Sequence, residues 1–293
     1  MCAQGKLIKH LINWQNNKVC GKRIGEMRNH VYIKIDEESE NIKMDVKQLF
    51  DKEMENYFET PKVLLGPWTS ESMKNDPKHL SFVLARYKFV AKMLEDKLTR
   101  EIMQLEIELE ALKKDNDELS KKRVLEIGCG DAFGTPIVAN VVENLYAIDW
   151  EERFIKDNSS RLSFADNIRF IQKDINSEPL DEKVSAIYNI DFIEHLAPEK
   201  EKLVMENMIS SYEDNEHAVM LIGTPNISAL QYASPQSKTL HINLKSHKTL
   251  KELLSRYFYN VFIFGMNDEV IHTGYAPMCH YLWGMGVGLK RRM

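Results

Sequence analysis

The sequence lacks any apolar run long enough to cross a membrane, and its first residues have no apolar core of the kind found in signal peptides. A spanning helix needs about 20 consecutive apolar residues. We therefore expect a cytoplasmic chain without a membrane partner. Its hydrophobic content of 43% and charged content of 28% are those of an ordinary globular protein.

Cysteine is also scarce, and the charge balance is negative. The four cysteines, at positions 2, 20, 129 and 279, form no CxxC pair, which argues against a zinc site and a disulfide framework. The formal net charge is −5, whereas nucleic-acid binders need clustered Lys and Arg for the phosphates. The short basic end at 290–292 is interpreted as a solvated tail, and we expect no nucleic-acid partner.

Against this background, the stretch VLEIGCGDAFGT at 124–135 stands out. It predicts a buried strand that breaks at Gly128 into a glycine turn and enters a helix near Pro136. Without a Cβ, Gly128 and Gly130 can adopt positive φ and let a ligand approach the main chain. An ordinary strand-to-helix turn of another α/β protein is the alternative.

The spacing in this stretch separates two classes of nucleotide. A dinucleotide fingerprint has the pattern G-x-G-x-x-G, but Phe133 occupies the third glycine position here. Glu126 would also repel a pyrophosphate and suits a cationic ligand instead. A nicotinamide-dependent oxidoreductase therefore remains only a remote alternative.

The stretch resembles motif I of the class I S-adenosylmethionine-dependent methyltransferases, whose cofactor carries an amino group and a sulfonium. The resemblance implies that Glu126, Gly128 and Gly130 bind this cofactor. It also implies roles for residues after the next two strands: Asp149 holds the ribose, Trp150 borders the adenine, and Asp174 binds the adenine amino group with Ile175 beside it. A helix cap is the alternative for Asp174.

From residue 124 onward, predicted strands alternate with helices, which is typical of a doubly wound parallel sheet. The predicted fold is α/β, with a seven-stranded, mostly parallel, Rossmann-like methyltransferase sheet over 123–293. Ligands of such sheets bind at the carboxyl ends of the strands. The predicted strands are 124–127, 145–148, 168–171, 186–190, 218–222, 261–264 and 279–282.

The segment after the fourth predicted strand, DFIEHL at 191–196, resembles the D-x-x-E-H-L form of motif IV. This motif borders the methionine end of the cofactor, which implies cofactor binding by Asp191. His195 is the first candidate general base because imidazole titrates near neutral pH. A purely capping role for Glu194 and His195 is the alternative.

Two further segments are predicted to reach the same edge of the sheet, at the carboxyl ends of its strands. The insertion at 226–246 is rich in hydrogen-bonding groups, and we expect a lid there with His241 as a second candidate base. The turn at 265–275 adds Asp268 as a further catalytic candidate. Asp191, Glu194, His195 and His241 also form a possible metal set, but two imidazoles suit Mg²⁺ poorly, and we expect no metal.

The N-terminal part divides into an extension at 1–75 and a helical segment at 76–122. Heptad spacing predicts a narrow apolar seam that mediates a homodimer, lies against its own domain or pairs with the N-terminal helix. The seam comprises Leu98, Ile102, Leu105, Leu109, Leu112, Asn116 and Leu119.

These features predict a methyltransferase that transfers a methyl group from S-adenosylmethionine to oxygen or nitrogen of a polar small molecule, leaving S-adenosylhomocysteine. Motifs such as YASPQS and MNDEVIHTG resemble bacterial enzymes of surface-glycan and small-molecule modification. The expected acceptor is a sugar or a nucleotide-linked sugar. A non-catalytic cofactor-binding or assembly protein on the same fold is the alternative.

Overall fold

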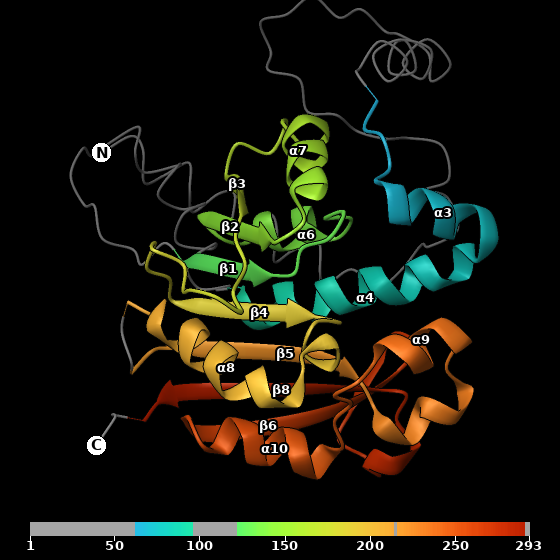
Figure 1. The fold of residues 1–293 in the computed structure, drawn as a ribbon, viewed down its shortest axis with the longest axis vertical. Helices are drawn as coiled ribbons and strands as arrows, with labels where there is room; N and C mark the ends of the chain where they lie inside the picture. Colours follow the sequence, from blue (N-terminus) through green and yellow to red (C-terminus); the bar gives the residue numbers. More distant parts are fainter. Residues whose placement is uncertain (1–61, 96–121, 214–215, 291–293) are drawn as a thin grey trace, which may run out of the picture. The chain divides into compact units, whose positions relative to one another are not determined.

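The computed structural model describes residues 62–95, 122–213 and 216–290. They belong to one compact unit, residues 62–293, built around an eight-stranded sheet in the order β3-β2-β1-β4-β5-β8-β6-β7 (Figure 1). The predicted α/β fold is confirmed. Among the helices of these ranges, none has the length and apolar character of a membrane span.

The first five strands are parallel and follow the apolar runs of the sequence. They are β1 (Arg123–Ile127), β2 (Asn144–Asp149), β3 (Ile168–Gln172), β4 (Ala186–Ile190) and β5 (Val219–Pro225). Strands β1 and β4 are almost entirely buried, as expected for central strands covered on both faces. Because the five strands are parallel, their carboxyl ends all lie at one edge of the sheet.

The other strands run in mixed directions, and there is one more than predicted. Strand β8 (Tyr281–Leu289) pairs antiparallel with both β5 and β6 (Phe258–Asn267). The additional strand, β7 (Val270–His272), forms a hairpin with β6 inside the segment predicted as a plain turn. Its two-residue connection contains Asp268 at φ +51° and lacks the Asn-Gly signature of such hairpins, which explains why it was missed.

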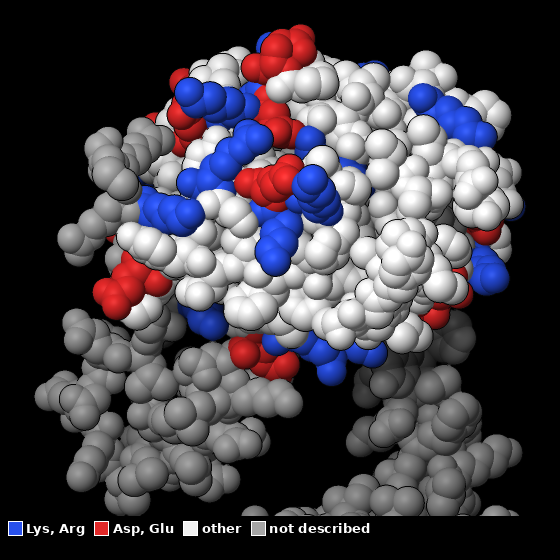
Figure 2. Space-filling model, turned by 90° about the horizontal axis from the view of Figure 1, so that it is seen from below, with Lys and Arg blue, Asp and Glu red and all other residues white. Residues whose placement is uncertain are grey.

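Helices cover both faces of the sheet. One apolar core lies beneath α4 (Pro77–Leu94), α6 (Thr135–Ala139) and α7 (Glu152–Arg161). The other lies beneath α8 (Glu201–Ser210) and α10 (His247–Ser255). In α10, buried Leu250, Leu253 and Leu254 line one face, while the opposite face is charged. Figure 2 shows the molecule from the side on which α10 lies. On this face Lys and Arg are interspersed with Asp and Glu, as on a solvated surface.

Helix α3 (Pro67–Asn75) belongs to this unit although the sequence assigns it to the N-terminal extension. It docks on the loop after β1, because the Thr69 N–H and hydroxyl both donate to Asp131 Oδ2, at 2.7 and 2.8 Å. A Cβ on Gly66 would lie 2.6 Å from the Asp131 side chain, so glycine permits this close approach. The heptad seam at 98–119 lies outside the described residues.

Candidate functional site

The glycine turn after β1 has the predicted backbone. Gly128 and Gly130 adopt φ of +71° and +52°, which L-residues with a Cβ rarely do. A Cβ on Gly128 would lie 2.9 Å from the Phe192 ring, and one on Gly130 would lie 2.8 Å from the Trp68 ring. Aromatic rings from α3 and from the segment after β4 thus lie against the turn, and both positions require glycine.

Asp149, at the end of β2, holds this turn in place. Its Oδ2 accepts a hydrogen bond from the Gly130 N–H at 3.0 Å, and its Oδ1 accepts one from the Glu151 N–H at 2.9 Å. Each carboxylate oxygen keeps a lone pair for a further donor. Asp149 and Trp150 line a cavity of about 580 Å³, here called the β2 cavity, together with Pro67, Trp68, Glu151, Arg153 and Phe154.

A smaller hollow of about 220 Å³, the turn cavity, lies over the glycine turn. Trp68 borders both it and the β2 cavity and contacts Phe154 edge-on, with ring centroids 4.5 Å apart. Gly128, Gly130 and Phe133 also line the turn cavity. At its far side are His79 and Asp191, which also line the third cavity.

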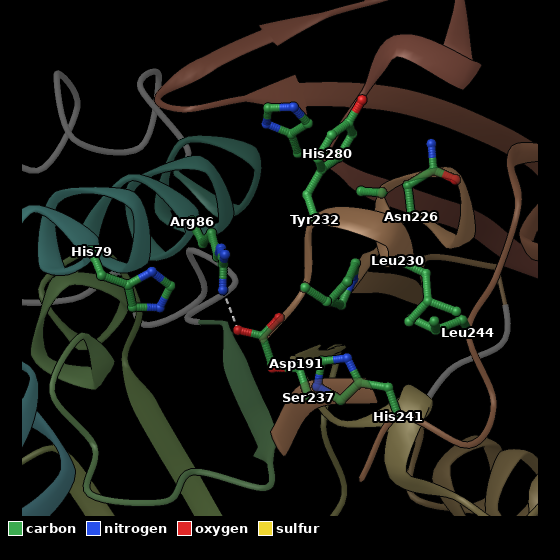
Figure 3. Close-up of a pocket in the computed structure, with 13 residues that line it drawn as sticks. His79, Arg86, Asp191, Asn226, Leu230, Tyr232, Ser237, His241, Leu244 and His280 are labelled. Carbon is green, nitrogen blue, oxygen red and sulfur yellow. Dashed lines mark hydrogen bonds and ion pairs between the residues drawn. The ribbon is translucent and has the colours of Figure 1, made fainter. Parts of the chain in front are cut away.

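The third cavity, the lid cavity, has a volume of about 600 Å³. One wall is the predicted lid, which folds into a 3₁₀ helix, η3 (Ile227–Tyr232), and a short helix, α9 (Pro235–Leu240). Figure 3 shows this wall facing His79 and Arg86 of α4, with Asp191 between them. The lining is His79, Arg86, Asp191, Pro225, Asn226, Ala229, Leu230, Tyr232, Ala233, Ser237, His241, Leu244 and His280.

Arg86 is the site residue that the sequence analysis missed. Its guanidinium forms an ion pair with Asp191 Oδ2 and lies 4.2 Å from the centroid of the Tyr281 ring. Burial opposes the charge, but the Asp191 carboxylate outweighs it and raises the pKa of Arg86. His79 and Arg86 are seven residues apart and so share one face of α4, but this spacing does not show that the face lines a site.

The motif IV residues lie beneath the lid. Glu194 is fully buried and accepts a hydrogen bond from Thr224 Oγ1 at 3.0 Å, while its Oε1 has no partner among the described residues. Burial, with the nearby Asp191 charge, raises the pKa of Glu194. The lid is tied to this point because the Asn243 N–H donates to the Glu194 carbonyl at 2.9 Å.

His195 and His241 meet above Glu194. Their ring centroids are 4.9 Å apart and nearly perpendicular. His195 is exposed, and its Nδ1 lies 3.2 Å from the Leu240 carbonyl; His241 is half-buried and lines the lid cavity. Ligand atoms of Glu194, His195 and His241 all lie within 4.8 Å of one another. The structure therefore brings three of the four possible metal ligands into one cluster.

Five predicted site residues do not line these three cavities: His195, described above, and the four that follow. Glu126 is buried behind the turn, where it accepts a hydrogen bond from Thr135 Oγ1 at 2.8 Å; burial raises its pKa to about 7. Asp174 Oδ1 accepts hydrogen bonds from Asn176 N and Nδ2, which closes a turn rather than capping a helix, since no helix begins there. Ile175 is in the core, and Asp268 is exposed in the β6–β7 connection. Their proposed site roles stay predictions.

Residues 124–213 match a family described as "Methyltransferase domain". Similar solved structures include the methyltransferase domain of bacterial CtHen1 (13% identity, 70% of this chain and 99% of that chain, TM-score 0.50). They also include the N-methyltransferase NodS of Bradyrhizobium japonicum, at 14% identity over 66% of this chain and 97% of that chain, with a TM-score of 0.44. The small RNA methyltransferase HEN1 is similar at 15% identity over 66% of this chain and 26% of that chain, with a TM-score of 0.47. At these identities the likeness shows the fold alone. No curated protein gives a significant match.

Proposed function

We propose that the chain is an S-adenosylmethionine-dependent methyltransferase, and that it methylates oxygen or nitrogen of a polar small molecule, a sugar or a nucleotide-linked sugar. The reaction would belong to bacterial glycan or secondary metabolism, as the resemblance of its lid motifs suggests. The cofactor supplies a methyl group already activated by a sulfonium, so the protein's task is to position the acceptor and to accept its proton.

The proposed cofactor path follows the two cavities that Trp68 joins. The adenosine part occupies the β2 cavity, where Asp149 offers its remaining lone pairs to the ribose and Trp150 borders the base. The methionine part occupies the turn cavity above Gly128 and Gly130, whose positive φ brings the backbone close to the ligand.

The acceptor then occupies the lid cavity. The observation that carries this proposal is that Asp191 and His79 line both the turn cavity and the lid cavity. A methyl group at this junction would face an acceptor held by the lid. Its lining of imidazole, amide and hydroxyl groups among apolar side chains suits a polar molecule.

His241 is the proposed general base. It lines the lid cavity, whereas His195 is exposed and engaged with the Leu240 carbonyl. Burial, followed by the neighbouring His195, lowers the pKa of His241, so its imidazole is neutral at pH 7 and can accept a proton. The acceptor oxygen or nitrogen bonds to the methyl carbon, the carbon–sulfur bond breaks toward sulfur, and His241 takes the acceptor's proton.

A divalent cation at the cluster of Glu194, His195 and His241 is the alternative way to activate the acceptor. Two observations favour a metal site. The ligand atoms of the three residues lie close together, and Glu194 Oε1 has no hydrogen-bond partner among the described residues. One carboxylate and two imidazoles fit Zn²⁺, Mn²⁺ or Fe²⁺ better than Mg²⁺. Activity that survives exhaustive chelation, and is unchanged by added Mn²⁺ or Zn²⁺, would eliminate this alternative.

Two measurements test the proposed function. Calorimetric titration with S-adenosylmethionine and NAD should show binding of the former only. Mass spectrometry should then detect S-adenosylhomocysteine together with an acceptor heavier by one methyl group, in a screen of sugars and nucleotide-linked sugars. Cofactor binding without turnover on any acceptor class would favour the non-catalytic alternative; tight NAD binding would revive the oxidoreductase.

A further inference from the structure

The lid cavity is unusually rich in groups that donate hydrogen bonds to anions. Arg86, His79, His241 and His280 all line it, and Asp191 is the one carboxylate in its lining. The groups come from three separate parts of the chain: α4, the lid and the segment before β8. They converge on the space that the proposed function gives to the acceptor, so their chemistry bears on what that acceptor carries.

Arg86 is the fixed charge in this set. Its side chain is only 13% exposed, and the Tyr281 ring supports the flat face of the guanidinium. A guanidinium carries five N–H donors in a rigid fork. Among the described residues, Arg86 donates one hydrogen bond, to Asp191 Oδ2. Arg86 lines the lid cavity, and a planar guanidinium fork matches carboxylate and phosphate oxygens.

Asp191 explains how an arginine already in an ion pair can bind another anion. It has φ of +52° and stands where the turn cavity and the lid cavity meet. The methionine part of S-adenosylmethionine, like that of S-adenosylhomocysteine, carries an ammonium group that can donate hydrogen bonds to this carboxylate. Asp191 would then be shared between the cofactor and Arg86, which leaves Arg86 with uncompensated charge toward the lid side.

We propose that Arg86 is the anion receptor of the lid cavity and that the acceptor carries an oxyanion, a phosphate or a carboxylate, which the Arg86 guanidinium binds. This inference rests on the proposed function and narrows its substrate class to acidic or phosphorylated sugars, including nucleotide-linked ones. Neutral sugars would lack the group that Arg86 recognises. The three histidines surround the same space as further hydrogen-bond donors.

Calorimetry on protein saturated with S-adenosylhomocysteine tests this assignment. The probes are glucose 1-phosphate, UDP-glucose, glucuronate and inorganic pyrophosphate, with glucose as the neutral reference. We expect at least one oxyanion probe to bind more tightly than glucose. Arg86→Met should weaken that binding by about 10- to 100-fold, and Arg86→Lys should restore part of it because a lysine keeps the charge without the fork.

The matched control is Arg123→Met, which removes a different carboxylate-paired arginine, at the start of β1. It should leave every affinity unchanged. Affinity for S-adenosylhomocysteine and the thermal unfolding curve are recorded for each variant. If S-adenosylhomocysteine fails to bind the wild type, the proposed function fails. If it binds but no oxyanion probe exceeds glucose, or Arg86→Met binds the probes like the wild type, the Arg86 proposal is overturned. Phosphate-only or carboxylate-only binding identifies the oxyanion.

Discussion

His241 is the residue whose role is most directly testable. Once an acceptor is identified, His241→Gln should lower kcat by about 10²- to 10⁴-fold, the usual contribution of a general base. Because burial and His195 lower the pKa of His241, activity should be full at pH 7 and should fall only below the ordinary histidine pKa of about 6.5. The measurement is kcat against pH. An unaltered kcat in the variant would assign the proton to another group.

The control for this variant is His247→Gln, since His247 is exposed at the first position of α10. It should retain the wild-type rate and pH profile. Affinity for S-adenosylhomocysteine should stay within about twofold in both variants, because neither imidazole lines the β2 cavity or the turn cavity.

Glu126 makes a separate prediction, about stability. Burial raises its pKa to about 7 in the folded state, against about 4.3 for an unfolded glutamate. Its proton therefore stabilises the fold fully below the unfolded pKa, and this contribution is lost as pH rises through 7. Glu126→Gln stays neutral, so it should be more stable than wild type at pH 7.5, by up to about 3 kcal/mol. Denaturant unfolding of both proteins at pH 7.5 and at pH 5 measures this difference in the free energy of unfolding.

At pH 5 the two proteins should differ far less, because wild-type Glu126 is then protonated in the folded state. Glu143→Gln is the matched control, since Glu143 is exposed, and it should show little pH-dependent difference. Equal stability of Glu126→Gln and wild type at pH 7.5 would contradict the prediction and would point to a charged Glu126.

At the scale of elements, α3 is expected to close the cofactor site. Trp68→Ala removes the ring that joins the β2 cavity to the turn cavity and contacts Phe154. Affinity for S-adenosylhomocysteine should fall about tenfold, as for loss of a large aromatic contact. Met73→Ala, on the same helix and exposed, is the control and should bind normally. Wild-type affinity in Trp68→Ala would show that α3 is no part of the site.

The parallel half of the sheet could be predicted because each strand is a short apolar run followed by polar residues. The glycine turn could be predicted because Gly128 and Gly130 need positive φ that other residues avoid. Arg86 could not be placed in the same way, because its partner Asp191 is 105 positions away and helix periodicity does not reveal which strand a helix crosses. Trp68 could not be placed from the sequence for the same reason: its approach to the turn depends on tertiary packing.

At the scale of the whole molecule, the heptad seam leaves a homodimer and packing within the chain as alternatives, and the ends of its segment suggest how to test the homodimer. Lys122 Nζ donates to the Leu94 carbonyl at 3.0 Å, so the chain leaves α4 and re-enters β1 within reach of one lysine side chain. A variant with residues 96–121 replaced by a short Gly-Ser linker should therefore fold and bind S-adenosylhomocysteine. Light scattering should give a dimer for the full chain and a monomer for this variant.

Changing Leu105 and Leu112 to charged residues should have the same effect on molar mass without altering the length of the chain. A full-length chain that is monomeric throughout would contradict the dimer. A deletion variant that stays dimeric would place the interface elsewhere in the chain.

The short Lys122–Leu94 contact also changes where the catalytic unit begins. The stretch that matches the methyltransferase family starts at 124, yet Trp68, His79 and Arg86 reach the cavities from before the heptad segment. The cavity walls are thus encoded on both sides of residues 96–121. An expression fragment that begins at residue 124 would lack α3 and α4, and with them the wall that Trp68, His79 and Arg86 form.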